Sequence, residues 1–357
     1  MTVWITKADV PESYYFRSSG YIANRDMVYF SSELGIKPLK YSRNKIMNTP
    51  EFSTDTVIEN IISPISPGDI VFVQFPTWLN YGFENLLIRK LISLPDVKVS
   101  LLLWDVISWL FDDSDRDFTR DNEFQLMNQC QLIISPNEKM TNRLVEDGGV
   151  KTKIISMGLS DYYCKTPPCF KKEFRKELTF VGTLEKTDFS NYHGNFLINL
   201  IGNPKDLTEE EKNQKNLKVV GALDNSKIPS YLNAGFGLVS YQNKNKIIEK
   251  SYFGGAERYG QFNNPLKLSL YLSSGLPVVV DRYSPHAERI EKEGLGLVIS
   301  ELNDIDEVLG CIDNLQYNTM TDNVWNYSIK LRSGFFSKNI LRKALLYLTS
   351  ESDCYIN

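Results

Sequence analysis

The stretch from Asn263 to Ser269, Asn-Asn-Pro-Leu-Lys-Leu-Ser, holds residue types suited to binding an anion. Asparagine is preferred just before a helix, and proline suits the first helical position because its missing N–H has no partner there. We therefore predict that Asn263 and Asn264 cap a helix that begins at Pro265. Lys267 and Ser269 would lie in its first turn and a half, where an ammonium, a hydroxyl and backbone N–H groups converge on a diphosphate. On periodicity alone, a capped helix with a solvated lysine is the alternative.

The surroundings of this stretch favour the binding interpretation. Ser274-Gly275-Leu-Pro277 ends the predicted helix and returns the chain to the sheet, and Tyr252-Phe-Gly-Gly-Ala-Glu-Arg-Tyr-Gly260 precedes it. Glycines in such a loop permit close approach of the backbone to a ligand.

A second candidate is Leu178-Thr-Phe-Val-Gly-Thr-Leu-Glu-Lys186, a strand that runs into a glycine turn. In an α/β sheet this turn lies at the carboxyl edge, where ligands bind, so Gly182 and Thr183 can approach a ligand while Lys186 supplies a cation. An ordinary turn with an exposed lysine is the alternative.

A third candidate is Ser18-Ser19-Gly20, which follows the first predicted strand. These small residues can receive a phosphate or a sugar, or Ser19 can simply cap the next helix. The spacing matches neither G-x-G-x-x-G nor a Walker loop, which argues against a nicotinamide dinucleotide and against ATP-driven phosphoryl transfer.

Two apolar strands of the first half end in polar and aromatic residues, namely Gln74, Thr77, Trp78, Trp104 and Asp105. Aromatic faces beside amide and carboxylate groups suit a carbohydrate, whose rings have apolar C–H faces and hydroxyl edges. The alternative places the tryptophans in the core. Asp105 is either a general base or the cap of the following helix.

The composition excludes several classes of protein. The 357 residues carry a net charge of −4, which offers no general attraction to nucleic acid or to an anionic membrane. Five cysteines without C-x-x-C spacing and only two histidines argue against a disulfide framework, a histidine-rich metal site and a Ser-His-Asp triad. With neither a secretory signal nor a membrane-spanning run in the sequence, we expect a soluble, cytoplasmic protein.

The elements that would position these residues alternate between short apolar strands and amphipathic helices, the pattern of parallel sheets with crossover helices. We predict strands at 3–6, 70–74, 97–104, 132–135, 178–181, 217–220, 236–239, 277–280 and 296–299. The predicted helices are 22–34, 56–62, 83–92, 137–146, 226–232, 265–273, 285–292, 305–315 and 323–348.

These elements form two doubly wound α/β domains, 1–157 on the acceptor side and 158–335 on the donor side, and residues 336–357 form a terminal helix whose docking the pattern leaves open. Two such sheets facing each other across a cleft predict a ligand at the carboxyl ends of their strands.

Together these segments resemble the glycosyltransferases that extend O-glycans on bacterial serine-rich-repeat adhesins and the related galactofuranosyltransferase-like enzymes. The resemblance is most specific at Asn263–Val279 and extends to Gly68–Trp78, Ser135–Met140 and Phe180–Lys186. It implies a GT-B fold of two Rossmann-like domains, a UDP-sugar donor, no metal cofactor, and a homodimer or homotetramer.

By this resemblance the UDP-sugar is bound by Lys186, Asn264, Lys267 and Ser269, with Ser19 approaching it from the first domain. The turn Gly221-Ala-Leu-Asp224 would border the nucleotide. Related sequences read His-Asp and then Leu-Arg where this chain has Trp104-Asp105-Val-Ile-Ser-Trp, so Asp105 is the catalytic candidate that remains.

The resulting hypothesis is a UDP-sugar-dependent hexosyltransferase that moves glucose onto protein-linked GlcNAc of a serine-rich-repeat glycoprotein. Two alternatives stay open: a galactofuranosyltransferase of surface polysaccharide synthesis, and a non-catalytic subunit that binds a nucleotide sugar.

Overall fold

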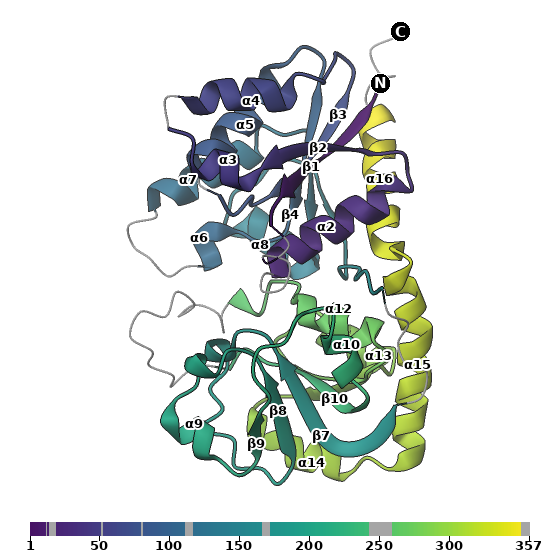
Figure 1. The fold of residues 1–357 in the computed structure, drawn as a ribbon. Coiled ribbons are helices and arrows are strands. Elements are labelled where there is room, and N and C mark those ends of the chain that lie inside the picture. Colours follow the sequence, from purple (N-terminus) through teal and green to yellow (C-terminus); the bar gives the residue numbers. More distant parts are fainter. Residues whose placement is uncertain are drawn as a thin grey trace. The chain divides into compact units, whose positions relative to one another are not determined.

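The computed structural model describes residues 1–11, 13, 19–50, 53–79, 81–110, 117–165, 172–242 and 259–350 (Figure 1). These residues divide into two compact units. The first lies within Met1–Trp109, Asp113–Asp161 and Gly334–Asn357, and the second within Leu110–Asp112 and Tyr162–Ser333. Each unit contains one six-stranded sheet in which every strand pairing is parallel, which confirms the predicted pair of doubly wound α/β domains.

The first sheet has the strand order β2-β1-β3-β4-β5-β6. Its strands are β1 (Val3–Asp9), β2 (Lys37–Ser42), β3 (Ile70–Phe75), β4 (Lys98–Leu103), β5 (Leu132–Ser135) and β6 (Ile154–Ser156). The helices of this unit are α2 (Ser19–Ser32), α3 (Arg43–Met47), α4 (Thr54–Ile62), α5 (Tyr81–Ser93), α6 (Ile107–Leu110), α7 (Asp117–Met127), α8 (Glu138–Glu146) and α16 (Phe335–Ser350). Every residue of β3 is buried, because helices cover both faces of a parallel sheet.

The terminal helix α16 belongs to the first unit, which settles the docking that the sequence left open. Leu341, Ala344 and Leu348 are fully buried in the same core cluster as Ile5 and Phe72. Figure 1 shows the yellow α16 beside the purple α2, with which it packs.

The second sheet has the strand order β12-β11-β10-β7-β8-β9. Its strands are β7 (Glu173–Val181), β8 (Leu197–Ile201), β9 (Leu217–Val219), β10 (Ala234–Val239), β11 (Val278–Asp281) and β12 (Gly296–Ile299). The α-helices are α9 (Glu209–Asn213), α10 (Ile228–Tyr231), α12 (Leu266–Ser273), α13 (Ala287–Lys292), α14 (Ile305–Gly310) and α15 (Asn314–Arg332). The described residues of this unit also form the 3₁₀ turns η3 (Leu184–Lys186), η4 (Pro204–Asp206) and η5 (Leu302–Asp304).

The single helix predicted over 323–348 is wrong. Two helices, α15 and α16, replace it, and Gly334 separates them with a left-handed φ of 71°. A Cβ at Gly334 would also collide with the Phe30 side chain, so the break needs a residue that tolerates positive φ and has no side chain.

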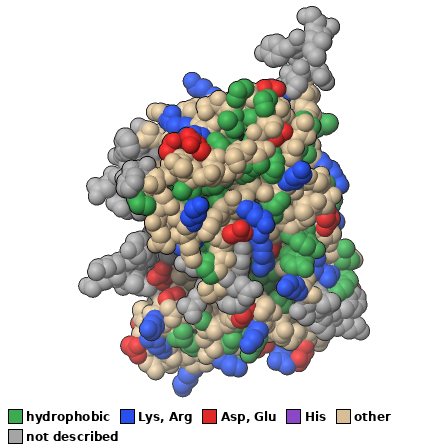
Figure 2. Space-filling view, turned by 45° about the horizontal axis from the view of Figure 1, so that its top comes forward, with side chains coloured by type: hydrophobic (Ala, Val, Ile, Leu, Met, Phe, Trp, Pro, Cys, Tyr) green, Lys and Arg blue, Asp and Glu red, His purple; other side chains and the backbone are tan. Residues whose placement is uncertain are grey.

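Charges of both signs are mixed on one face of the protein (Figure 2). On the face that Figure 2 presents, Lys and Arg side chains are interspersed with Asp and Glu and do not gather into one basic area. Binding an anion therefore requires a local group of cations. Among the described residues, no helix is both long enough and apolar enough to cross a bilayer.

Candidate active site

The strand order of the second sheet locates a ligand crevice. Counted from β7, the chain builds β8 and β9 on one side and then returns to build β10, β11 and β12 on the other. The direction reverses between β7 and β10, and in open α/β sheets ligands bind at this point, outside the carboxyl ends of the strands. The segments that follow these two strands are Gly182–Lys186 and Ser240–Gln242.

Lys267, in the first turn of α12, directs its side chain to this reversal point. Its Nζ lies 3.7 Å from the ring centroid of Phe180 on β7 and 4.6 Å from that of Tyr241, just after β10. The ammonium is buried and has no hydrogen-bond partner among the described residues. Burial, aided by the nearby charge of Lys186, lowers the pKa of Lys267 well below its usual range, and Asp281 acts in the opposite direction. A buried ammonium without a hydrogen-bond partner is a suitable group to bind a phosphate oxygen.

The loop after β7 brings Lys186 into this neighbourhood at the end of the 3₁₀ turn η3. Gly182 opens the loop with φ of 130°, and a Cβ built there meets no atom within 4 Å. Gly221, after β9, has φ of 94° and the same open space. Open backbone at the carboxyl edge allows a ligand to approach closely, as predicted for a nucleotide at Gly182 and at Gly221.

The start of α12 differs from its predicted form. Pro265 itself occupies the N-cap position, and no side chain makes a capping hydrogen bond. Instead, Asn264 Oδ1 lies 2.7 Å from Nε2 of His286, which follows β11. The prediction that Asn263 and Asn264 cap this helix is therefore wrong, because a tertiary contact takes the Asn264 oxygen. Asn264 and Lys267 nevertheless lie within one turn of each other.

Ser269 is 2% exposed within α12. Residues two positions apart on a helix point in nearly opposite directions, so the structure does not bring Ser269 to the same side as Lys267. Its assignment to the UDP-sugar site stays a prediction.

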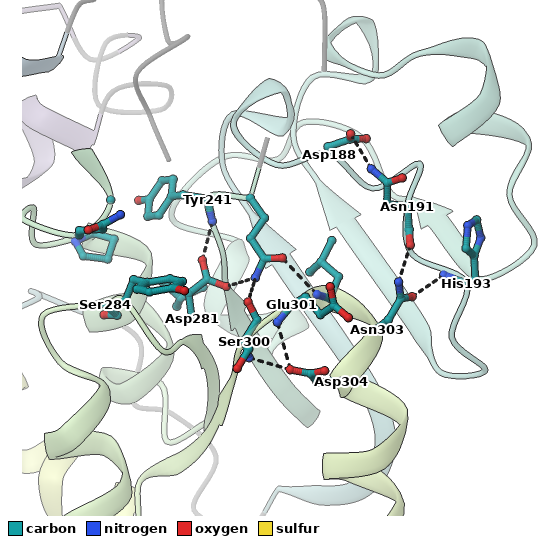
Figure 3. A pocket seen from close by; sticks show the side chains of 17 residues that line it. Asp188, Asn191, His193, Tyr241, Asp281, Ser284, Ser300, Glu301, Asn303 and Asp304 are labelled. Atoms are coloured by element: carbon teal, nitrogen blue, oxygen red, sulfur yellow. Dashed lines mark hydrogen bonds between the residues drawn. The ribbon is translucent and has the colours of Figure 1, made fainter. Parts of the chain in front are cut away.

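A pocket of about 560 Å³ lies at the carboxyl ends of β10, β11 and β12. Figure 3 shows Asp281 at its centre, accepting hydrogen bonds from the backbone N–H of Tyr241 at 2.9 Å and from Gln242 Nε2 at 2.7 Å. Gln242 Oε1 in turn accepts from the N–H of Leu302 at 3.2 Å. Burial raises the pKa of Asp281 to about 6. The pocket adjoins the lysine site, since Tyr241 lines it and also contacts Lys267.

Sequence reasoning missed Gln242 and Asp281, which line this pocket. Their signal is positional, because each lies at or just after the carboxyl end of a predicted strand.

In the first sheet the order reverses between β1 and β3. Ser19, exposed, begins α2, which follows β1 in the chain. A Cβ on Gly20 would lie 2.9 Å from Nε1 of Trp78, which follows β3, so the two segments meet at this reversal. Gln74 is buried instead of lining a site: its amide nitrogen donates to the carbonyl of Thr6 at 2.8 Å, and its oxygen accepts from Trp104 at 3.1 Å.

Asp105 lies two residues past β4 and is half-buried. The N–H groups of Ile107 and Ser108, in the first turn of α6, donate to the carboxylate of Glu123 at 3.0 and 3.2 Å. Glu123 thus accepts from the helix start that Asp105 would cap in one of its two predicted roles. Burial, with a contribution from Asp105, raises the pKa of Glu123.

A further buried acid, Glu84 of α5, accepts hydrogen bonds from the backbone and hydroxyl of Thr77. Its Oε2 is buried and has no partner among the described residues. Burial raises the pKa of Glu84 to about 7. Both this residue and Glu123 stand on the apolar face of their helix, with hydrophobic residues three and four positions on, and that is the signal by which a sequence could reveal them.

Two predicted features lie outside the described residues: Ser18 and the Tyr252–Arg258 part of the glycine-rich loop.

Solved structures identify the fold class. Sucrose-phosphate synthase from Thermosynechococcus elongatus superposes with a TM-score of 0.64 at 11% identity, over 98% of this chain and 100% of that one. HepE from Anabaena, in complex with UDP and glucose, superposes with a TM-score of 0.60 at 11% identity, over 96% and 99%. Both are GT-B glycosyltransferases, and the predicted GT-B fold is confirmed.

Sequence comparison identifies the family as well as the fold. The Glucosyltransferase 3-like N-terminal domain matches residues 2–159, and the C-terminal domain of the same family matches residues 178–344. The chain therefore belongs to the Glucosyltransferase 3-like family of glycosyltransferases.

Named relatives agree with this assignment. The chain is 26% identical to Glucosyltransferase 3 of Streptococcus gordonii over 94% of its length and 96% of the relative. It is 24% identical to Glucosyltransferase 3 of Streptococcus parasanguinis over 97% and 98%. The β-1,6-galactofuranosyltransferase WbbI of Escherichia coli is 22% identical over 92% and 95%.

Proposed function

We propose that this glycosyltransferase moves glucose from UDP-glucose to protein-linked GlcNAc on a serine-rich-repeat glycoprotein. The observation that carries the donor class is the buried ammonium of Lys267, which has no hydrogen-bond partner in the described part of the chain and lies near Lys186 at the reversal point of the second sheet. Two lysines and a helix start suit the two negative charges of a diphosphate. The names of the two streptococcal relatives and the UDP complex of HepE support the choice of sugar and nucleotide.

In the proposed reaction the bond between the sugar C1 and the β-phosphate oxygen breaks, and its electron pair leaves with UDP. The acceptor hydroxyl oxygen forms the new bond to C1, and its proton passes to the Asp105 carboxylate. Lys186 and Lys267 stabilise the negative charge that grows on the departing UDP. We propose that these two cations take the place of the divalent ion that other transferases use for this purpose.

The test is a panel of UDP-sugars incubated with a GlcNAc-bearing peptide, with the linkage of the product determined by NMR. Glucose transfer from UDP-glucose by the isolated chain is the expected result. Transfer of galactofuranose instead would support the second candidate, which the similarity to WbbI favours. UDP binding without turnover, with activity restored by a second chain, would show a non-catalytic subunit, and an absence of UDP binding would overturn the proposal.

A further inference from the structure

The pair formed by His286 and Asn264 is a second feature of the α12 start. His286 is 3% exposed and belongs to the turn between β11 and α13. Its Nε2 lies 2.7 Å from Asn264 Oδ1, two residues before α12 begins. A carboxamide oxygen only accepts hydrogen bonds, so Nε2 carries the hydrogen in this contact.

The backbone around the imidazole is held by three hydrogen bonds. The N–H of His286 donates to Ser284 Oγ at 3.3 Å, and the N–H of Ser284 donates to the carbonyl of Asp281 at 2.9 Å. The carbonyl of His286 accepts from the N–H of Ile290 at 2.9 Å, in the first turn of α13. The donor that meets Asn264 is therefore fixed to the end of β11 and to α13.

The contact with His286 sets the orientation of the Asn264 carboxamide. With Oδ1 directed at the imidazole, the nitrogen of Asn264 points to the other side of the amide. If the amide rotated by half a turn, an oxygen would replace that nitrogen, and an oxygen repels an anion where an N–H attracts it. The contact with His286 opposes this rotation.

We propose that His286 is a positioning residue for donor binding, which orients the Asn264 carboxamide so that its nitrogen serves the diphosphate at the start of α12. This inference rests on the proposed function, because it requires a nucleotide diphosphate at that helix start. If His286 only stabilised the turn, its removal would affect ligands with phosphates and ligands without them equally.

The test compares UDP with uridine, which lacks the phosphates. His286→Leu removes the N–H donor, His286→Gln keeps an N–H at a similar reach, and Glu288→Gln on the exposed side of α13 is the matched control. Thermal unfolding and circular dichroism confirm that each variant folds. UDP affinity is measured by titration calorimetry, and uridine binding by ligand-observed NMR.

We expect His286→Leu to weaken UDP binding about 10- to 150-fold, the range for loss of a hydrogen bond to a charged group, and to leave uridine binding unchanged. His286→Gln should recover most of the UDP affinity, and Glu288→Gln should match the wild type. In turnover, the KM for UDP-glucose should rise more than kcat falls. Equal loss of UDP and uridine, unchanged UDP affinity, or failure of Gln to rescue would each overturn the inference.

A double-mutant cycle gives a second readout if His286→Leu alone folds poorly. In an Asn264→Ala background, removal of the imidazole donor should cost no further UDP affinity, because the group that it orients is already gone. A full additional loss would show that His286 acts elsewhere. If the wild type itself binds no UDP, the proposed function fails first, and that result is distinct from any difference among the variants.

Discussion

Replacement of Lys267 by Met should make the protein more stable and a weaker binder of UDP. Methionine keeps the apolar stem of the side chain against Phe180 and Tyr241 and removes the charge. A buried polar group without a partner costs about 1–3 kcal/mol, and a cation over aromatic rings returns about 0.5–2 kcal/mol. The difference predicts a gain of about 1 kcal/mol in the free energy of unfolding of the unliganded protein.

The gain should depend on pH in one direction. Burial lowers the pKa of Lys267 in the folded state, so at pH values between the folded pKa and the ordinary value near 10.4 the unfolded chain holds more protons. Stability of the wild type therefore rises with pH across that window. The advantage of Lys267→Met should be largest below the window and should shrink toward alkaline pH.

The affinity for UDP should fall in Lys267→Met, whereas the free energy of unfolding should rise. A hydrogen bond between the ammonium and a phosphate is worth about 1.5–3 kcal/mol, which corresponds to a rise of about 10- to 150-fold in the Kd for UDP. An anion beside Lys267 also raises its pKa, so UDP-glucose binding by the wild type should take up protons and weaken as pH rises. Lys267→Met should show no such uptake.

Urea unfolding at several pH values measures the stability, and calorimetry in two buffers of different ionisation enthalpy measures Kd and proton uptake. Lys218→Met, on the exposed side of β9, controls for the general effect of the substitution. A Lys267→Met protein that is less stable than the wild type, or that binds UDP with unchanged affinity, would refute the reasoning.

Three further outcomes test other parts of the structure. Gly237→Ala should lower the free energy of unfolding by roughly 1–3 kcal/mol in urea, because its Cβ would collide with the Tyr271 ring, whereas Gly310→Ala, with open space, should not. Burial raises the pKa of Asp161 to about 7, so between about pH 4 and pH 7 the folded protein holds a proton that the unfolded chain has lost. The free energy of unfolding of the wild type should therefore fall as the pH rises from about 4 to 7. Asp161→Asn should flatten that part of the profile measured by urea unfolding. Asp105→Asn should reduce kcat by about 10²- to 10⁴-fold in the transfer assay with the Kd for UDP unchanged, and unchanged turnover would remove Asp105 as the base.

Buried central strands leave the clearest mark on composition, although the interior strand β8, with the run Leu-Ile-Asn-Leu-Ile, was missed. β3 and β4 are buried in the middle of a parallel sheet, so they read as continuous apolar runs. β2 is an edge strand in which only Leu39 and Tyr41 are buried, and β6 is three half-buried residues long. Neither pattern differs from that of a loop, and both strands were missed.

The candidate site was predictable where its signal is local and not where it is tertiary. Lys186 and Lys267 stand out because each follows a recognisable turn or helix start. The contact between Asn264 and His286 depends on where β11 places the second residue, and no spacing rule gives that distance. The same limit explains why Asn264 was expected to cap α12.

The location of Lys267 connects core packing to binding. Phe180 belongs to the buried core cluster of the second unit and packs edge-on against Phe189, with ring centroids 5.1 Å apart. The same ring supports the Lys267 ammonium. Because the cation rests on the core instead of on a solvated loop, it needs little reorganisation when charge develops on a leaving diphosphate, and preorganisation of this kind is a main source of electrostatic catalysis. The buried ammonium destabilises the unliganded protein, as expected for a protein in which activity requires some loss of stability. A variant that stabilises this unit by removing the charge should therefore lose transfer activity in the same step.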